Sequence, residues 1–364
     1  DLRLRASRAG AARVRRVGAQ LAAAGPVARA QFLLPAVGLR GSGTAPRRSR
    51  NVKDFGIASM NNVALVTVAT QQQISASDTE YGALKTAYVY PVSVDNKARY
   101  CASHGCKLVV GGEASEASGR SSRWNKVAWL RREFKSHDWL VWMDLDALFL
   151  RPDKYLMSSL DPSFDLHVTY DFGSTMKVNT GLFVLRTSSW SWWFLEQVWL
   201  HNDFGEAKSD QNSINHVLST MPTRTLRAHV KVYPREIFNA FPRVNFTSVE
   251  DYEQPELPGD EVANTEVIHF AGQYGGARGH DGQTPPVMLL QFYDLMLEHH
   301  LRFLDRLEAY AATRSDGHPD GDTSTSATGA IDIDAGGRLR PLATVRATLA
   351  GARRQLHRDC LRWL

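Results

Sequence analysis

Cysteine is scarce in this chain. Its 364 residues include three cysteines, Cys101, Cys106 and Cys360, and no two of them form a Cys-x-x-Cys pair. Zinc sites and small disulfide-stapled folds both need clustered cysteines. The sequence therefore indicates neither a zinc site nor a disulfide framework, and it leaves a single optional bridge open.

Long uncharged apolar runs are also absent. The nearest approach, residues 17–39, is interrupted by Gln20, Arg29 and Gln31 and holds two prolines. A helix that spans a bilayer needs about 20 predominantly apolar residues in succession, so this stretch is a poor membrane anchor. Its Arg- and Ala-rich surroundings resemble an organelle transit peptide. A targeting peptide, a stem and an incomplete gene product all stay open for this region.

Acidic residues are nearly missing from positions 1–50, which hold eleven Arg and one acid, Asp1. That segment carries a net charge of +10 while the whole chain carries +5, so the remainder carries −5. Nucleic-acid-binding domains present a basic surface. Because the basic character belongs to the tail, we expect no nucleic-acid partner.

The composition divides the chain into four parts. With 43% apolar residues it can bury a substantial core, whereas residues 314–337 are rich in Gly, Ser, Thr and Asp and lack aromatic residues. We expect a basic N-terminal tail, one folded domain, a low-complexity linker and a basic C-terminal tail, over residues 1–55, 58–312, 313–340 and 341–364, respectively.

Strand-like and helix-like segments alternate within the folded part. Apolar runs typical of buried strands occupy residues 63–69, 107–110, 139–143 and 182–185. Helical stretches lie between them, near residues 95–104, 124–137 and 188–203. This alternation predicts an α/β fold with a mostly parallel sheet covered by helices. Ligands of such sheets collect at the carboxyl ends of the strands.

Two carboxylates follow one of the clearest strands, because residues 139–150 read WLVWMDLDALFL. Asp144 and Asp146 would repel each other unless a cation neutralised them, and hard divalent cations prefer oxygen ligands. The pattern therefore favours a metal site. It also resembles the Asp-x-Asp-Gly-Thr of haloacid-dehalogenase-type phosphatases, in which the first Asp is the nucleophile. Ala147 and Leu148 stand where that motif has Gly and Thr, which makes this the weaker interpretation.

Four further segments accompany the aspartates. They read NKARYCASHG at 96–105, WNKVAWLRR at 124–132, NTGLFVLR at 179–186 and HFAG at 269–272, and Asp210-Gln211-Asn212 opens a helix-like stretch. In this order and spacing the set resembles glycosyltransferase family 34, which contains fungal galactosyl- and mannosyltransferases and plant xyloglucan xylosyltransferases. The resemblance covers about residues 60–305.

The resemblance implies a GT-A type domain that uses Mn²⁺ and a nucleotide-sugar donor, a UDP-sugar rather than GDP-mannose, and retains the anomeric configuration. The acceptor would be a glycan or a polysaccharide. Asp144, Asp146 and His269 would bind the metal, a mixed oxygen and nitrogen set that suits Mn²⁺. A lone buried His is otherwise a structural residue, and that alternative stays open.

The resemblance also assigns the residues that handle the donor. Asp210 and Gln211 would face the donor sugar as catalytic residues, although an Asp at a helix start also has a capping explanation. Gly181 would let the backbone approach a sugar, or simply make a tight turn. The residues expected to bind the donor are Thr67, Lys126, Asp144, Asn179, Gly181 and Gly272.

The sequence says less about the cellular location and the oligomeric state of the protein. Asn245-Phe246-Thr247 is a glycosylation sequon, and the resemblance implies the Golgi membrane or lumen. A non-catalytic glycan-binding or scaffold role is the alternative outside the enzymes, because some members of such families act in complexes. Both homo- and hetero-oligomers stay open.

Overall fold

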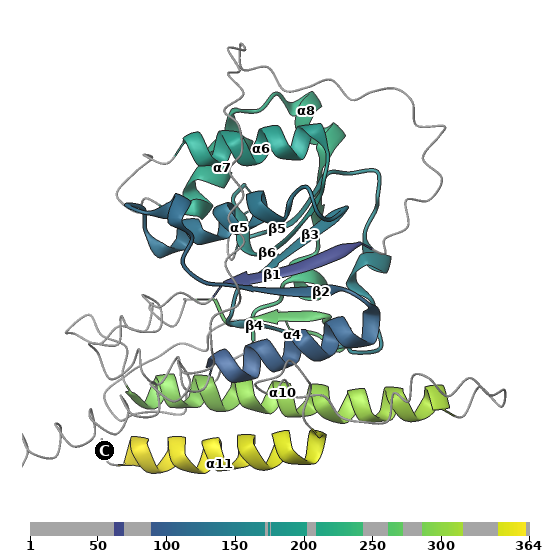
Figure 1. The fold of residues 1–364 in the computed structure, drawn as a ribbon, viewed down its shortest axis with the longest axis vertical. Helices are drawn as coiled ribbons and strands as arrows, with labels where there is room; N and C mark the ends of the chain where they lie inside the picture. Colours follow the sequence, from purple (N-terminus) through teal and green to yellow (C-terminus); the bar gives the residue numbers. More distant parts are fainter. Residues whose placement is uncertain are drawn as a thin grey trace, which may run out of the picture.

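The chain folds around one central sheet with helices on both faces (Figure 1). This computed structural model describes residues 62–68, 89–171, 174, 176–201, 209–242, 261–271, 286–315 and 341–361. The strands are β1 Val63–Val68, β2 Lys107–Gly111, β3 Trp139–Met143, β4 Ala147–Phe149, β5 Leu166–Tyr170, β6 Val178–Arg186, β7 Val230–Tyr233 and β8 Val267–His269. The helices are α4 Tyr90–His104, α5 Asn125–Glu133, α6 Ser189–Leu200, α7 Asp210–Thr220, α8 Thr223–His229, α9 Arg235–Phe238, α10 Pro286–Ser315 and α11 Leu342–Leu361.

Six strands form the central sheet in the order β2-β1-β3-β6-β5-β7. The pairs β1–β2, β1–β3 and β5–β7 are parallel, while β6 runs antiparallel to both β3 and β5. Only β6 is thus reversed within this sheet. The predicted α/β fold with a mostly parallel sheet is confirmed, including strands in all four of the expected segments.

Alternation along each strand builds a core on each face of the sheet. In β1, Val63 and Leu65 face the core beneath α4 and α10, while Ala64 and Val66 face the core beneath α5 and α6. Both sides of the strand are therefore buried, which is why it reads as an unbroken apolar run. Trp190 of α6 is also fully buried, in the core beneath α5 and α6.

A second, two-stranded sheet determines where the site forms. β4 begins only three residues after β3 ends and pairs antiparallel with β8, with Ala147 opposite His269. The far edge of β4 is held by α4, because the Asn96 amide both donates to the Phe149 carbonyl, at 3.0 Å, and accepts from the Phe149 N–H, at 2.8 Å. The side chain thus replaces a neighbouring strand.

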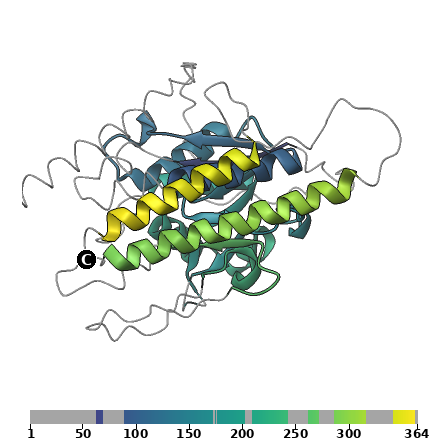
Figure 2. The same cartoon turned by 90° about the horizontal axis from the view of Figure 1, so that it is seen from below.

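The two long helices α10 and α11 lie side by side (Figure 2), and α10 packs against α4 on one face of the central sheet. Val345 and Leu349 of α11 join the core that α10 and α4 share. Arg346 of α11 pairs with Asp305 and Glu308 of α10 at 2.7 and 2.9 Å. The segment expected to be a basic C-terminal tail therefore contains a helix that packs on the domain.

One disulfide joins Cys101 in α4 to Cys106, with 4.5 Å between the two Cα atoms. This is the bridge that the sequence left open. None of the helices within the described ranges is long and apolar enough to cross a membrane. The expected N-terminal tail, residues 316–340 of the expected linker and the sequon at Asn245 lie outside the described residues, whereas residues 313–315 belong to α10.

Candidate active site

The two aspartates occupy the loop between β3 and β4, at the carboxyl end of a buried strand. Their backbone is fixed on both sides: Asp144 N–H donates to the Gly181 carbonyl at 2.7 Å, and the Asp146 carbonyl accepts from Phe270 N–H at 2.7 Å. The Trp142 indole donates to Asp144 Oδ1 at 2.7 Å. This leaves Asp144 Oδ2 to face the centre of the site.

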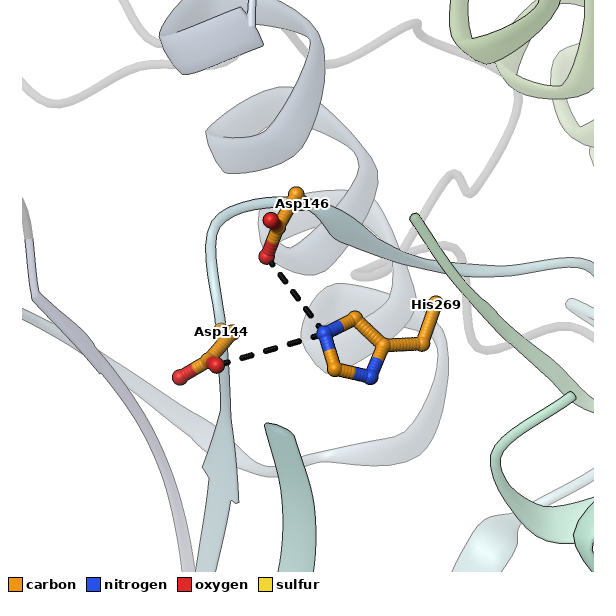
Figure 3. A group of neighbouring side chains, drawn as sticks. All are labelled: Asp144, Asp146 and His269. Carbon is orange, nitrogen blue, oxygen red and sulfur yellow. Dashed lines mark ion pairs between the residues drawn. The ribbon is translucent and has the colours of Figure 1, made fainter. Parts of the chain in front are cut away.

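His269 brings the third candidate ligand from a segment more than a hundred residues away (Figure 3). Its Nε2 lies 4.0 Å from Asp144 Oδ2 and 3.6 Å from Asp146 Oδ1. Pairing of β8 with β4 and a hydrogen bond from His269 N–H to the Ala240 carbonyl, at 2.6 Å, hold the residue there. The imidazole itself is buried, whereas both carboxylates are partly exposed.

This arrangement fits a divalent cation. One ligand atom from each of the three side chains lies within 4.8 Å of the others, and two atoms bound about 2.1 Å from one ion are at most about 4.2 Å apart. Both distances to His269 fall within that limit. Burial raises the pKa of Asp144, the Asp146 charge raises it further, and the Lys126 ammonium opposes both. A cation between these carboxylates would relieve the same repulsion.

Because Gly181 has no side chain, the His269 imidazole can lie directly against its backbone. A Cβ atom built on Gly181 would lie 1.8 Å from His269 Cε1 and 2.5 Å from each ring nitrogen. Contacts under 3.0 Å essentially never occur for a real Cβ. The close approach at this glycine is therefore made by the histidine ring.

Lys126 lies at the centre of the charged groups. Its Nζ is 2.8 Å from Asp210 Oδ2 and 3.4 Å from Asp144 Oδ1, and it donates to the Thr180 carbonyl at 2.8 Å. Burial lowers the pKa of this ammonium, but the charges of Asp144 and Asp210 outweigh burial and leave the pKa above its ordinary value. The side chain is buried, so Lys126 is not a solvated surface lysine.

Asp210 and Gln211 open α7 beside the Asn179-Thr180-Gly181 segment of β6. Ser209 is the residue that caps the helix, because its side chain accepts from Asn212 N–H. The Thr180 N–H and hydroxyl both donate to Gln211 Oε1 at 3.2 Å. The predicted donor-sugar residues are thus brought together next to the metal ligands.

Lys97 lies just beneath the metal ligands. It is fully buried, and its Nζ donates to the Ala147 carbonyl at 2.8 Å and to Ser93 Oγ at 2.6 Å. Burial lowers its pKa to about 7, against the opposing charges of Asp146 and Asp144. Because Ala147 directly follows Asp146, Lys97 and Asn96 together hold the backbone that presents this aspartate.

Thr67 and Gly272 complete the set of expected donor residues. Thr67 lies near the end of β1 and is fully buried, and its hydroxyl has no hydrogen-bond partner in the described part of the chain. Gly272 lies outside the described residues. The structure adds three residues that the motifs did not indicate, Asp171, Arg235 and Asn239.

Comparison with known proteins identifies the segment that carries the aspartates. Residues 60–164 match the galactosyl transferase GMA12/MNN10 family profile. This segment belongs to glycosyltransferase family 34. The family 34 match includes Lys126, Asp144 and Asp146, whereas Asn179, Asp210 and the other site residues beyond position 164 are placed here by the geometry.

Curated family 34 relatives share parts of the chain. The probable alpha-1,6-mannosyltransferase MNN10 of Saccharomyces cerevisiae is 26% identical over 200 residues, which cover 42% of this chain and 47% of that protein. The probable xyloglucan 6-xylosyltransferase 5 of Arabidopsis thaliana is 33% identical over 108 residues, covering 27% of this chain and 23% of that protein. The chain thus spans less than half the length of these relatives.

Solved structures with a related arrangement include glycosyltransferases. One, involved in glycosylation of the major capsid of PBCV-1, gives a TM-score of 0.40 at 16% identity and covers 58% of this chain and 93% of that one. The glycosyltransferase GlyE of Streptococcus pneumoniae gives a TM-score of 0.40 at 13% identity and covers 71% of this chain and 66% of that one.

Proposed function

We propose that this chain is a retaining α-glycosyltransferase that moves a hexose or pentose from a nucleotide-sugar donor, a UDP-sugar, to a glycan or polysaccharide acceptor with Mn²⁺ as cofactor. The observation that carries the proposal is the convergence of Asp144, Asp146 and His269 from two distant segments, directly beside the Lys126–Asp210 ion pair. Family 34 membership of residues 60–164 supports it.

Charge separation during transfer explains the arrangement. As the bond between sugar and diphosphate breaks, negative charge grows on the leaving oxygen and positive charge on the sugar. Asp144, Asp146 and His269 would hold a divalent ion, which supplies positive charge to the departing diphosphate when it is bound. Both aspartates lie in the short loop that follows β3, so the end of this strand positions the two carboxylates together.

The sugar side uses groups of opposite polarity. The Asp210 carboxylate and the Gln211 amide oxygen lie together around Thr180 and supply negative charge for an oxocarbenium-like sugar. Lys126 lies between Asp210 and Asp144, 2.8 Å from the first carboxylate and 3.4 Å from the second, and holds Asp210 in place beside the proposed metal ligands. One half of the proposed site would bind the metal ion, and the other half would stabilise the positive charge that develops on the sugar.

The proposed location is the Golgi membrane or lumen. Disulfides persist in oxidising compartments such as those of the secretory pathway, and the Cys101–Cys106 bridge fits such a compartment.

The test is a donor screen. The purified chain would be incubated with UDP-galactose, UDP-xylose, UDP-glucose or GDP-mannose, with and without Mn²⁺, while nucleotide release is measured. We expect Mn²⁺-dependent release from a UDP-sugar and its loss in Asp146→Asn, whose isosteric side chain removes one ligand charge. The melting temperature of that variant should match the parent.

Two outcomes would reject the proposal. Release from none of the four donors would favour the scaffold role, and undiminished release in Asp146→Asn would remove the metal assignment. A stable aspartyl adduct at Asp144 in beryllium fluoride would instead support the phosphatase interpretation.

A further inference from the structure

Asp171 is a carboxylate that the sequence motifs did not single out. It directly follows β5, whose pairing with β6 places Thr169 opposite Asn179. The Asp171 N–H donates to the Lys177 carbonyl at 2.7 Å. The side chain is therefore held beside the start of β6, on the same side of the site as α7.

The carboxylate contacts two side chains assigned to the donor sugar. Asp171 Oδ1 accepts from Asn179 Nδ2 at 3.0 Å, and Asp171 Oδ2 accepts from Gln211 Nε2 at 2.9 Å. An ionised carboxylate can only accept hydrogen bonds, whereas an amide has one donating and one accepting end. Asp171 therefore selects the NH₂ end of both amides.

That selection determines where the amide oxygens lie. The Gln211 oxygen turns toward Thr180, whose N–H and hydroxyl donate to it at 3.2 Å. The Asn179 oxygen accepts from Gly181 N–H at 2.9 Å and from Asn239 Nδ2 at 3.0 Å. Reversing either amide would place an NH₂ group against donors and would leave the carboxylate without its partner.

We infer that Asp171 is a positioning residue for sugar transfer, which acts by fixing the amide orientation of Gln211 and Asn179. The inference rests on the proposed function. In this role the carboxylate touches neither donor nor acceptor. Its charge lies behind the Gln211 NH₂ group and polarises the amide, so that more negative charge resides on the amide oxygen beside Thr180.

Asp171→Asn tests the inference, because the variant keeps the shape of the side chain and makes one of its two ends a donor. One of the two amides then meets an NH₂ group and loses its fixed orientation. We expect kcat for Mn²⁺-dependent donor turnover to fall about 10- to 100-fold, as it does when an outer-shell partner is lost. The donor KM and the Mn²⁺ concentration for half activation should change less than about twofold, because the metal ligands are untouched.

A double variant separates positioning from general damage. Gln211→Glu alone sets two carboxylates against each other, whereas combining it with Asp171→Asn restores a hydrogen bond with donor and acceptor exchanged. We expect the double variant to have a higher kcat than Gln211→Glu alone, a coupling that a purely structural residue would not show. Asp153→Asn is the matched control, because Asp153 is exposed and pairs with Arg151 away from the site.

Normal kcat in Asp171→Asn, or additive losses in the double variant, would overturn the inference while leaving the proposed function intact. An equal loss of activity in Asp153→Asn would overturn it too. An unsubstituted chain without donor turnover in the same assay would overturn both.

Discussion

Gly181→Ala is expected to abolish Mn²⁺-dependent turnover although it adds only one methyl group. The new Cβ would overlap His269 Cε1, at 1.8 Å. The ring cannot step aside cheaply, because β8 is paired with β4 and His269 N–H is bonded to Ala240. We expect the Mn²⁺ dissociation constant, measured by calorimetry, to rise by at least about the 10- to 100-fold seen when an outer-shell partner is lost.

Two controls locate the cause of that loss. Gly351→Ala makes the same chemical change in α11, where a Cβ meets nothing within 4 Å, and should leave Mn²⁺ binding unchanged. In a His269→Ala background, Gly181→Ala should cost little more, because the clash has gone. Tight Mn²⁺ binding by the single Gly181→Ala variant would show that His269 is not a ligand.

Lys126→Met is expected to produce a loss of both stability and turnover. The substitution leaves Asp210, whose side chain is 5% exposed, without its countercharge at 2.8 Å. Removing one partner of a buried ion pair costs about 3 to 5 kcal/mol. Urea denaturation should show that decrease in the free energy of unfolding. Donor turnover should be lost because Asp210 and Asp144 both lose the ammonium group that they contact.

The matched control is Lys107→Met, since Lys107 is 60% exposed and lies 3.5 Å from Glu133. An exposed pair of this kind contributes about 0 to 1 kcal/mol. Adding Asp210→Asn to Lys126→Met should restore much of the stability, because no buried charge is left alone, without restoring turnover. A loss below about 1 kcal/mol in Lys126→Met would contradict a buried role for the ion pair.

The sequence predicts those elements whose pattern of apolar residues lies within one short segment. β1 and β3 are buried on both faces and therefore read as continuous apolar runs. The reversal of β6 has no such signal, because its direction depends on pairing with β3 and β5. The sheet of β4 and β8 joins two three-residue strands far apart in the sequence, and segments that short have no usable periodicity.

The same distinction applies to the site. Asp144 and Asp146 were found because they follow a strand directly, and His269 was found only through the family resemblance. Asp171 and Asn239 had no motif, since their roles come from contacts across 40 and 60 residues of sequence. The basic charge of residues 341–364 suggested a tail, but Val345 and Leu349 pack α11 on the core and Arg346 pairs with acidic residues of α10.

The central claim is that Asp144, Asp146 and His269 bind one metal ion that serves sugar transfer, and anomalous X-ray diffraction from crystals grown with Mn²⁺ and UDP tests it most directly. We predict one anomalous peak between the three side chains, about 2.0 to 2.3 Å from Asp144 Oδ2, Asp146 Oδ1 and His269 Nε2, with the diphosphate completing the coordination. A peak elsewhere, or clear density for UDP with no anomalous signal among these residues, would contradict the account.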